Sequence, residues 1–179
     1  MRNIFSLTNH EVYVLTAAHE GRENGQVATW IMPATLAAGF HRLVAVISRN
    51  NFTHGLLAGS GRFGLSLLAR AQVDLLPHFG LLSGHDQDKM SGVPLERTPS
   101  GLPVLSEAVG WVECEVMDAM EGGDRVVYLA DIVHSRLHPD RAPLRKGDAL
   151  SSLPDAVRQA LVQKRVDEGA RDAGLIRQR

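Results

Sequence analysis

The sequence is poor in the features that mark secreted, membrane-bound and metal-binding proteins. Among its 179 residues only Cys114 is a cysteine, which excludes an internal disulfide and a site built from several thiolates. No apolar run reaches the length of a membrane span. The first six residues have no apolar core like that of a signal peptide. We therefore expect a cytoplasmic protein that does not enter a membrane.

The charge balance and the missing motifs argue against further classes of protein and of functional site. A net charge of −1 argues against nucleic acid as a partner. The eight histidines are scattered and show no pair at helix-face spacing with a carboxylate, so we expect no metal site. Ser-His-Asp catalysis lacks the Gly-x-Ser-x-Gly elbow that would support it. The turn at 59–61 is not followed by the Gly-Lys-Ser/Thr of a phosphate loop.

What the sequence does contain is a series of short β-type segments separated by turn signals. With 44% hydrophobic and 22% charged residues, the chain is long enough to bury a core without disulfides or metals. The polar segment 20–25 predicts a hairpin turn, Pro33 should end the second strand, and 122–124 predicts a tight turn. We expect strands at residues 12–17, 27–32, 43–48, 63–68, 109–117 and 125–136.

Short helices are expected between these strands. Thr53 should cap one that begins there, and residues 71–79 suit a second, whereas 84–101 is polar and predicts a long excursion or lid. Strands that follow one another in this way favour a closed or nearly closed β-barrel over βαβ units. Cys114 lies in an alternating segment, where a small buried residue is favoured over a reactive thiol.

The last forty residues differ from the rest. Ser152-Leu153-Pro154-Asp155 resembles a capping box, with Asp in place of the usual Glu or Gln, and predicts a helix that extends to about Glu168. Its apolar stripe is narrow and consists of Val157, Leu161 and Leu153. Two interpretations stay open: a terminal helix lying on its own barrel, and an arm that packs on a dimer partner.

The loop after the third predicted strand carries the polar groups most suited to a ligand. It reads Ser48-Arg49-Asn50-Asn51-Phe52-Thr53 and places hydroxyls, amides and a guanidinium at the end of a buried run. Such groups can hold a phosphate. Taken alone, however, the loop is better interpreted as a solvated turn than as a phosphate site.

Several segments, taken in order, resemble one known family. Asn24-Gly25 is followed by Ala28-Thr29-Trp30-Ile31, then by the loop just described, by Gly61-Arg62-Phe63-Gly64, by Asp88-Lys89-Met90, and by Gly123-Asp124-Arg125. Over about residues 12–135 this order resembles the flavin reductase-like family of FMN-binding split barrels. The resemblance implies a mainly β fold with short helices: a Greek-key split β-barrel over 1–138, then an extension over 139–179 with a helix from about 153.

The resemblance also implies the residues of a flavin site. Ala28, Thr29, Trp30 and Ile31 would line the flavin. Ser48, Arg49, Asn50 and Thr53 would bind its phosphate, with Arg49 as the cation, while Phe79 would border the ring and Lys89 would be a second cation. Three alternatives remain: Trp30 and Phe79 as ordinary core aromatics, and Lys89 as a surface lysine.

Arg125 departs from the family pattern, which has Gly-Asp-His at this place. The family's His is thought to help hold the nicotinamide substrate, and arginine does not reproduce the neutral donor and acceptor of an imidazole. Arg125 could instead bind a pyrophosphate or carboxylate, so we assign it to the substrate.

The family implies a homodimeric FMN-dependent oxidoreductase of the flavin reductase type, with its site at the subunit interface. NAD(P)H would donate hydride to FMN, or to FAD as the alternative cofactor, and a partner monooxygenase or another acceptor would receive the electrons. No side chain is assigned as catalytic, because the redox chemistry belongs to the flavin. Two rivals are a flavin-binding electron carrier or sensor without a nicotinamide step, and a split barrel that has lost its cofactor.

Overall fold

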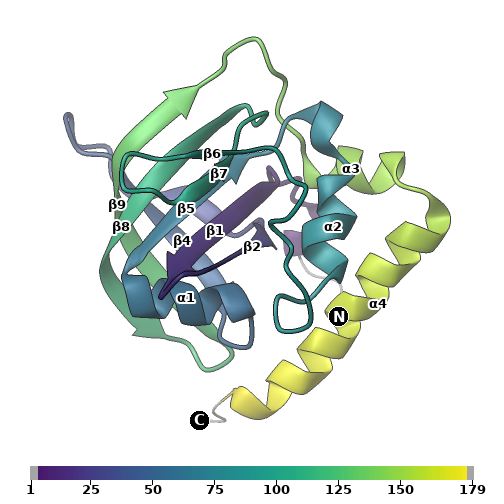
Figure 1. Cartoon of the computed structure of the whole chain (residues 1–179). Coiled ribbons are helices and arrows are strands. Elements are labelled where there is room, and N and C mark those ends of the chain that lie inside the picture. Colours follow the sequence, from purple (N-terminus) through teal and green to yellow (C-terminus); the bar gives the residue numbers. More distant parts are fainter. Residues whose placement is uncertain (1–3, 177–179) are drawn as a thin grey trace.

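The computed structural model describes residues 4–176 and is dominated by one curled antiparallel sheet (Figure 1). Residues 1–3, which belong to the segment considered for a signal peptide, and residues 177–179 lie outside that range. The sheet has seven strands in the order β2-β1-β5-β8-β9-β4-β3. Their bounds are β1 (Tyr13–His19), β2 (Arg22–Ala28), β3 (Ile31–Pro33), β4 (Arg42–Ser48), β5 (Arg62–Leu67), β8 (Gly110–Glu121) and β9 (Arg125–Leu137).

The connection between β2 and β3 shows how far the sheet curls. These strands occupy opposite edges of the sheet order, yet only Thr29 and Trp30 separate them in the chain. Three Cα–Cα steps span at most about 11 Å, so the two edges must lie close together. Trp30 also accepts a 3.0 Å hydrogen bond from the Val46 N–H of β4. The sheet is therefore a split barrel, as the resemblance implied.

The long strands β8 and β9 pair with each other along one side of the barrel (Figure 1). The register shifts between Glu113 and Cys114 and between Val116 and Asp118, and such irregularities bend a strand and increase its twist. The first half of β8 is buried, whereas its second half is exposed. Cys114 lies in the buried half, where burial raises the pKa of its thiol far above the ordinary value, in agreement with a structural role.

Two apolar clusters stabilise the fold. The first fills the barrel and includes Leu15, Ile47, Leu57, Phe63 and Tyr128. The second lies between the sheet and the helical side of the molecule. It includes Val14, Leu68, Phe79, Leu105 and Leu153. The helical side comprises α2 (Leu75–Leu81), α3 (Lys146–Ser152) and α4 (Asp155–Asp172), whereas α1 (Phe52–Ser60) packs near the ends of β1 and β2 (Figure 1).

The first hairpin corrects two predictions. The turn is not 20–25 but the two residues Glu20 and Gly21, whose φ values are +50° and +74°. Two central residues at positive φ match the twist of the flanking strands, so β2 begins at Arg22 and contains Asn24-Gly25. The strand predicted at 27–32 is likewise divided, because β2 pairs with β1 and β3 pairs with β4. Pro33 does end β3.

The predicted helix starts also need correction. Asn51, not Thr53, precedes α1, and no side chain caps it. The buried Thr53 hydroxyl instead accepts a hydrogen bond from Asn24 of β2. The helix predicted at 71–79 is a 3₁₀ turn (Arg70–Gln72) followed by α2. Within the predicted excursion 84–101, the strand β6 (Leu95–Arg97) pairs with β7 (Pro103–Leu105) to form a separate hairpin.

The C-terminal part contains a helix that the sequence reading missed. Ser152 ends α3 and does not cap the next helix; its Oγ donates to the Asp148 carbonyl at 2.8 Å. Leu153 is extended before Pro154, since a proline disfavours helical conformation in the residue before it. The last helix then begins at Asp155 and extends to Asp172, beyond the expected Glu168, and it lies beside α2 (Figure 1).

Candidate functional site

A cavity of about 250 Å³ lies where the edge of the barrel meets the helical side. Strand β2, the start of α1, the end of α2 with the loop after it, and α4 contribute its walls. It contains several amides, hydroxyls, an imidazole and cations, which are groups that orient a polar ligand. Those that precede α4 in the chain are Asn24, Gln26, Asn50, Asn51, Thr53, Ser83, His85 and Lys89.

Strand β2 contributes two buried amides. Asn24 and Gln26 are two residues apart, so their side chains emerge on the same face of the strand. The Asn24 Nδ2 donates to the Thr53 Oγ1 at 2.9 Å. The Gln26 Oε1 is buried and has no hydrogen-bond partner in the structure. A buried acceptor without a partner is costly, and it therefore fits a site that receives a donor from a ligand.

An aromatic ring and a glycine shape the cavity beside these amides. Phe79 of α2 is buried and lines the cavity. A Cβ atom on Gly25 would lie only 2.7 Å from Phe79 Cε1, so glycine is what lets the ring lie against β2. The loop after α2 rests on α1 through His85, whose ring meets the edge of Phe52 with centroids 5.1 Å apart.

The most unusual cation of the cavity is Lys89. Its side chain is buried, its Nζ donates a long 3.4 Å hydrogen bond to the Phe79 carbonyl, and the same nitrogen lies 5.8 Å from the centroid of the Phe79 ring. Burial, reinforced by the nearby charge of Lys164, lowers the pKa of Lys89 to about 8. A buried ammonium with so weak a partner is well suited to an anionic ligand. Lys89 is thus not a surface lysine.

Helix α4 closes the cavity with charged side chains. Lys164, Glu168 and Arg171 line it. Lys164 Nζ donates to the Leu81 carbonyl at 2.9 Å, which ties α4 to the end of α2. Its pairing with Glu168 is loose, with 4.0 Å between Nζ and Oε1.

The loop predicted to bind phosphate is only partly in this cavity. Asn50 and Thr53 line it, but Arg49 does not. Arg49 is about half exposed and forms a 3.0 Å ion pair with Glu121. Ser48 is buried, and its Oγ accepts the N–H of Asn50 at 3.3 Å. The loop therefore holds its shape through its own serine, while its arginine points to the β8–β9 turn.

Arg125 lies beside Trp30, close to the same loop. The guanidinium carbon of Arg125 lies over the Trp30 ring, 5.4 Å from its centroid, in a cation–π contact. Arg125 also pairs with Asp124 at 3.1 Å and with Asp172 of α4 at 3.4 Å. Trp30 is exposed and so is not a core aromatic. The two residues form a surface next to the cavity.

The sequence-predicted site residues thus fall into two groups. The cavity brings together Asn50, Thr53, Phe79 and Lys89. Those outside its lining are Ala28, Thr29, Trp30, Ile31, Ser48 and Arg49. Ala28 and Ile31 belong to or pack on the first apolar cluster.

Sequence reasoning did not assign Gln26, Asn51 or the α4 side chains to the site. Polar residues with period two in a strand, as at Asn24 and Gln26, were a usable signal for the first of these. No local sequence pattern indicates that α4 packs against the cavity.

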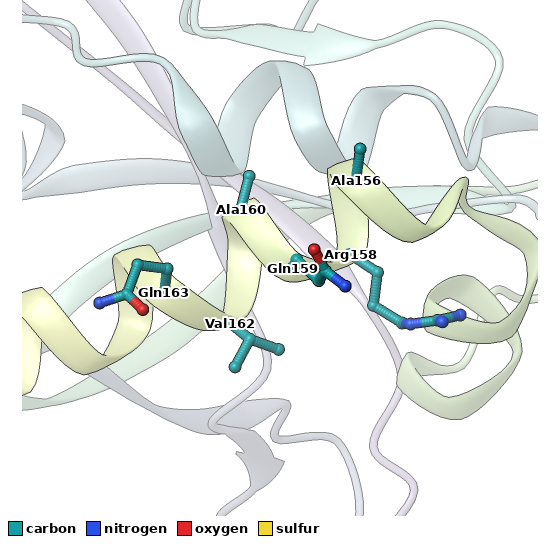
Figure 2. A pocket seen from close by; sticks show the side chains of 6 residues that line it. All are labelled: Ala156, Arg158, Gln159, Ala160, Val162 and Gln163. Atoms are coloured by element: carbon teal, nitrogen blue, oxygen red, sulfur yellow. The ribbon is translucent and has the colours of Figure 1, made fainter.

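A second depression lies on the outer face of α4 (Figure 2). All six of its lining residues, among them Ala156, Ala160 and Val162, belong to this one helix. Ala156 and Ala160 point to one side of the helix and Val162 to the other (Figure 2). No second element converges on it, and a binding site needs convergent polar groups. It is therefore not a candidate active site.

Within residues 4–176, no three His, Cys, Asp or Glu side chains gather in a way that could hold a metal ion. Nor does any helix there have the length and apolar character needed to cross a membrane.

Comparison with known proteins identifies relatives of the chain. Residues 5–148 match the family model described as flavin reductase like domain. The chain is 23% identical over 146 residues to the ferric-chelate reductase (NAD(P)H) of Archaeoglobus fulgidus, which covers 80% of this chain and 85% of that protein. It is 26% identical over 147 residues to the high molecular weight rubredoxin of Moorella thermoacetica, with 78% of this chain and 58% of that protein covered.

A solved structure supports the same relationship. The FMN-binding protein of Thermus thermophilus with bound p-hydroxybenzaldehyde is 26% identical and superposes with a TM-score of 0.69, over 76% of this chain and 77% of that chain. The chain nevertheless spans only about half the length of the first curated relatives it matches, 58% and 46%.

Proposed function

The chain belongs to the flavin reductase-like domain family, and on that premise we propose that it is an FMN-dependent oxidoreductase of the flavin reductase type. NAD(P)H is the proposed hydride donor, and a partner monooxygenase or another acceptor receives the electrons. The observation that carries the proposal is the cavity in which the weakly paired ammonium of Lys89 and the unpartnered Oε1 of Gln26 lie beside Phe79. FMN offers an anion, a ring donor and a flat apolar face for these three groups.

The residues present fit such a cofactor. Lys89 and the Asn50 amide provide a cation and a donor for a phosphate. Gln26 and Asn24 provide buried amides for the polar edge of a ring, and Phe79 provides an apolar wall. When bound, the flavin supplies hydride and electron transfer, so the protein needs only to bind and orient it. FAD is the alternative cofactor.

The wider set of flavin contacts remains part of the proposal. Ala28, Thr29, Trp30 and Ile31 link the two edges of the barrel next to the cavity, where they can border a ligand larger than the cavity itself. Arg49 and Ser48 flank Asn50, which lines it. The full proposed set is Ala28, Thr29, Trp30, Ile31, Ser48, Arg49, Asn50, Thr53, Phe79 and Lys89, with Arg125 assigned to the substrate.

We further propose that the protein is a homodimer that acts in the cytoplasm. Large apolar side chains are exposed along the segment that follows β2: Trp30, Met32, Leu36 and Phe40. An exposed apolar patch of this kind suits the burial of a second copy. From the family resemblance we also propose that the chain divides into a barrel domain at 1–138 and an extension at 139–179.

One observation favours a second candidate function, a flavin-binding electron carrier or sensor without a nicotinamide step. Arg125 stands where the family has a histidine, and the carboxylates of Asp124 and Asp172 already neutralise it. A neutralised guanidinium attracts a pyrophosphate less strongly than a free one does.

A spectroscopic experiment tests both proposals. The purified protein is reconstituted with FMN, freed of excess cofactor and titrated with NADH or NADPH without oxygen. Retention of flavin absorbance followed by its loss on addition of either nucleotide supports the oxidoreductase. Retention without bleaching supports the carrier, and failure to retain or bind any flavin contradicts both.

A further inference from the structure

The two halves of α4 are attached to the barrel in different ways. The first half is held by apolar packing, since Leu153 is buried and Val157 and Leu161 pack on the second cluster. Gly80 permits this approach, because a Cβ there would lie 3.0 Å from Leu161 Cδ2. Beyond Leu161 the attachment is polar, beginning with the hydrogen bond from Lys164 to the Leu81 carbonyl.

The far end of α4 is attached by one buried carboxylate. The Asp172 side chain is only 3% exposed, although its neighbours on the helix are exposed. Its Oδ1 accepts a 2.6 Å hydrogen bond from Asn50 Nδ2, and its Oδ2 lies 3.4 Å from an Arg125 nitrogen. The Nε of Arg171 lies 3.4 Å from the Oδ1 of Asp172. A carboxylate only accepts hydrogen bonds and is costly to bury without partners, so these groups determine where the helix ends.

The residues after α4 rest on the adjoining turn. Gly123, at φ +90°, lies so close to the backbone that follows α4 that a Cβ there would be 2.8 Å from the Leu175 carbonyl oxygen. Leu175 and Ile176 remain nearly half exposed. Residues 173–176 are therefore placed by backbone proximity and by Asp172 rather than by apolar burial.

Asp172 meets the two residues that are otherwise suited to an anion of the ligand. Asn50 belongs to the proposed phosphate loop, and Arg125 to the proposed substrate contact. An internal anion thus occupies groups that a phosphate or pyrophosphate would use. In addition, the cavity that α4 closes has about 250 Å³, which is below the range of about 300–1,000 Å³ found for small-molecule sites.

From these observations we propose that residues 162–176 form an autoinhibitory cover, in which the Asp172 carboxylate takes the place of the ligand's phosphate at Asn50 and also occupies Arg125, the proposed substrate contact. The inference rests on the proposed function, since it takes the ligand to be a flavin nucleotide. Binding of the nucleotide displaces Asp172, and the cover opens beyond Leu161, where the apolar attachment ends. Gly169 lies in this part of the helix, and glycine weakens helical structure.

The opposite role for Asp172 predicts an opposite result. If the carboxylate merely positioned Asn50 and Arg125 for the ligand, its removal would weaken binding. If it competes with the ligand, its removal increases the fraction of open protein and so strengthens binding. Asp172→Asn separates these cases, because it removes the charge while it keeps the size of the side chain.

The experiment compares full-length wild type, Asp172→Asn and Asp167→Asn in FMN titrations followed by flavin fluorescence. Asp167 is an exposed carboxylate of the same helix, whose Oδ1 accepts from Gln163 at 2.8 Å, so its variant controls for the change in net charge. We expect Asp172→Asn to lower the Kd for FMN about tenfold and Asp167→Asn to leave it unchanged. Hydrogen exchange of wild type with and without FMN gives a second readout that needs no variant, and we expect faster exchange in 162–176 when FMN is bound.

The outcomes separate the two proposals. Equal or weaker binding by Asp172→Asn, or slower exchange of 162–176 in the complex, overturns the cover but leaves the flavin site standing. If none of the three proteins binds FMN, the proposed function fails and the cover fails with it. If Asp172→Asn does not fold, the hydrogen-exchange measurement on the wild type alone tests the proposed cover.

Discussion

Asn24 and Thr53 are 29 residues apart in sequence, yet the Nδ2 of Asn24 donates a buried 2.9 Å hydrogen bond to the Oγ1 of Thr53. This bond links strand β2 to helix α1 at the wall of the candidate cavity. Another acceptor on the same wall is the unpartnered Oε1 of Gln26. On this wall the Asn24 amide is therefore fixed by Thr53, whereas the Gln26 oxygen is available to accept a hydrogen bond from a ligand.

Thr53→Val should destabilise the fold. The substitution keeps the shape of the side chain but leaves the buried Asn24 amide without its acceptor, which costs about 1–3 kcal/mol. Unfolding in urea measures the change in free energy, and Thr53→Ser is the control because it keeps the hydroxyl. Equal losses in both variants would assign the effect to packing rather than to the hydrogen bond.

Gly25→Ala should destabilise the protein because the new methyl group would collide with Phe79 Cε1 at 2.7 Å. Overpacking of this kind costs about 1–3 kcal/mol. Gly55→Ala is the matched control: Gly55 lies in α1 with nothing within 4 Å of the added Cβ, so alanine there should stabilise by roughly 0.5–1 kcal/mol. Thermal unfolding compares the two, and a stable Gly25→Ala protein would show that the ring can move aside.

Lys89 should make stability depend on pH above neutrality. Its pKa is lowered from 10.5 in the unfolded chain to about 8, so between these values the unfolded state binds more protons than the folded state. Stability therefore rises with pH across this window, by about 3 kcal/mol at most. Urea unfolding at pH 7.5, 9 and 10.5, on wild type and Lys89→Met, isolates this group, because methionine cannot titrate. Parallel curves for the two proteins would contradict a lowered pKa.

Arg49→Ala should weaken FMN binding about tenfold if the guanidinium leaves Glu121 to reach a phosphate. Arg62→Ala is the control, since Arg62 is similarly exposed and pairs with Glu115 at 3.2 Å. Neither variant should change stability by more than about 1 kcal/mol, because exposed ion pairs contribute little. Unchanged FMN affinity in Arg49→Ala would remove this residue from the phosphate site.

Within the barrel, the sequence-based predictions were wrong where strands, turns and helices begin and end. The β-rich runs predicted where strands lie, because alternation and β-branched content are local properties. The turn at Glu20 and Gly21 was misplaced, since Asn24-Gly25 is also a strong turn signal and only the register with β1 puts it inside β2. Thr53 looked like a helix cap for a similar reason, whereas its hydroxyl is used by Asn24 across the fold.

By itself, then, the sequence determined the barrel, the family and four of the residues that line the cavity: Asn50, Thr53, Phe79 and Lys89. These follow from short-range patterns and from the order of motifs. Only the tertiary structure decided that Arg49 turns to Glu121 and that α4 ends on Asn50 through Asp172. Such contacts join residues up to 122 positions apart, and no local pattern encodes which distant groups the closing of a barrel brings together.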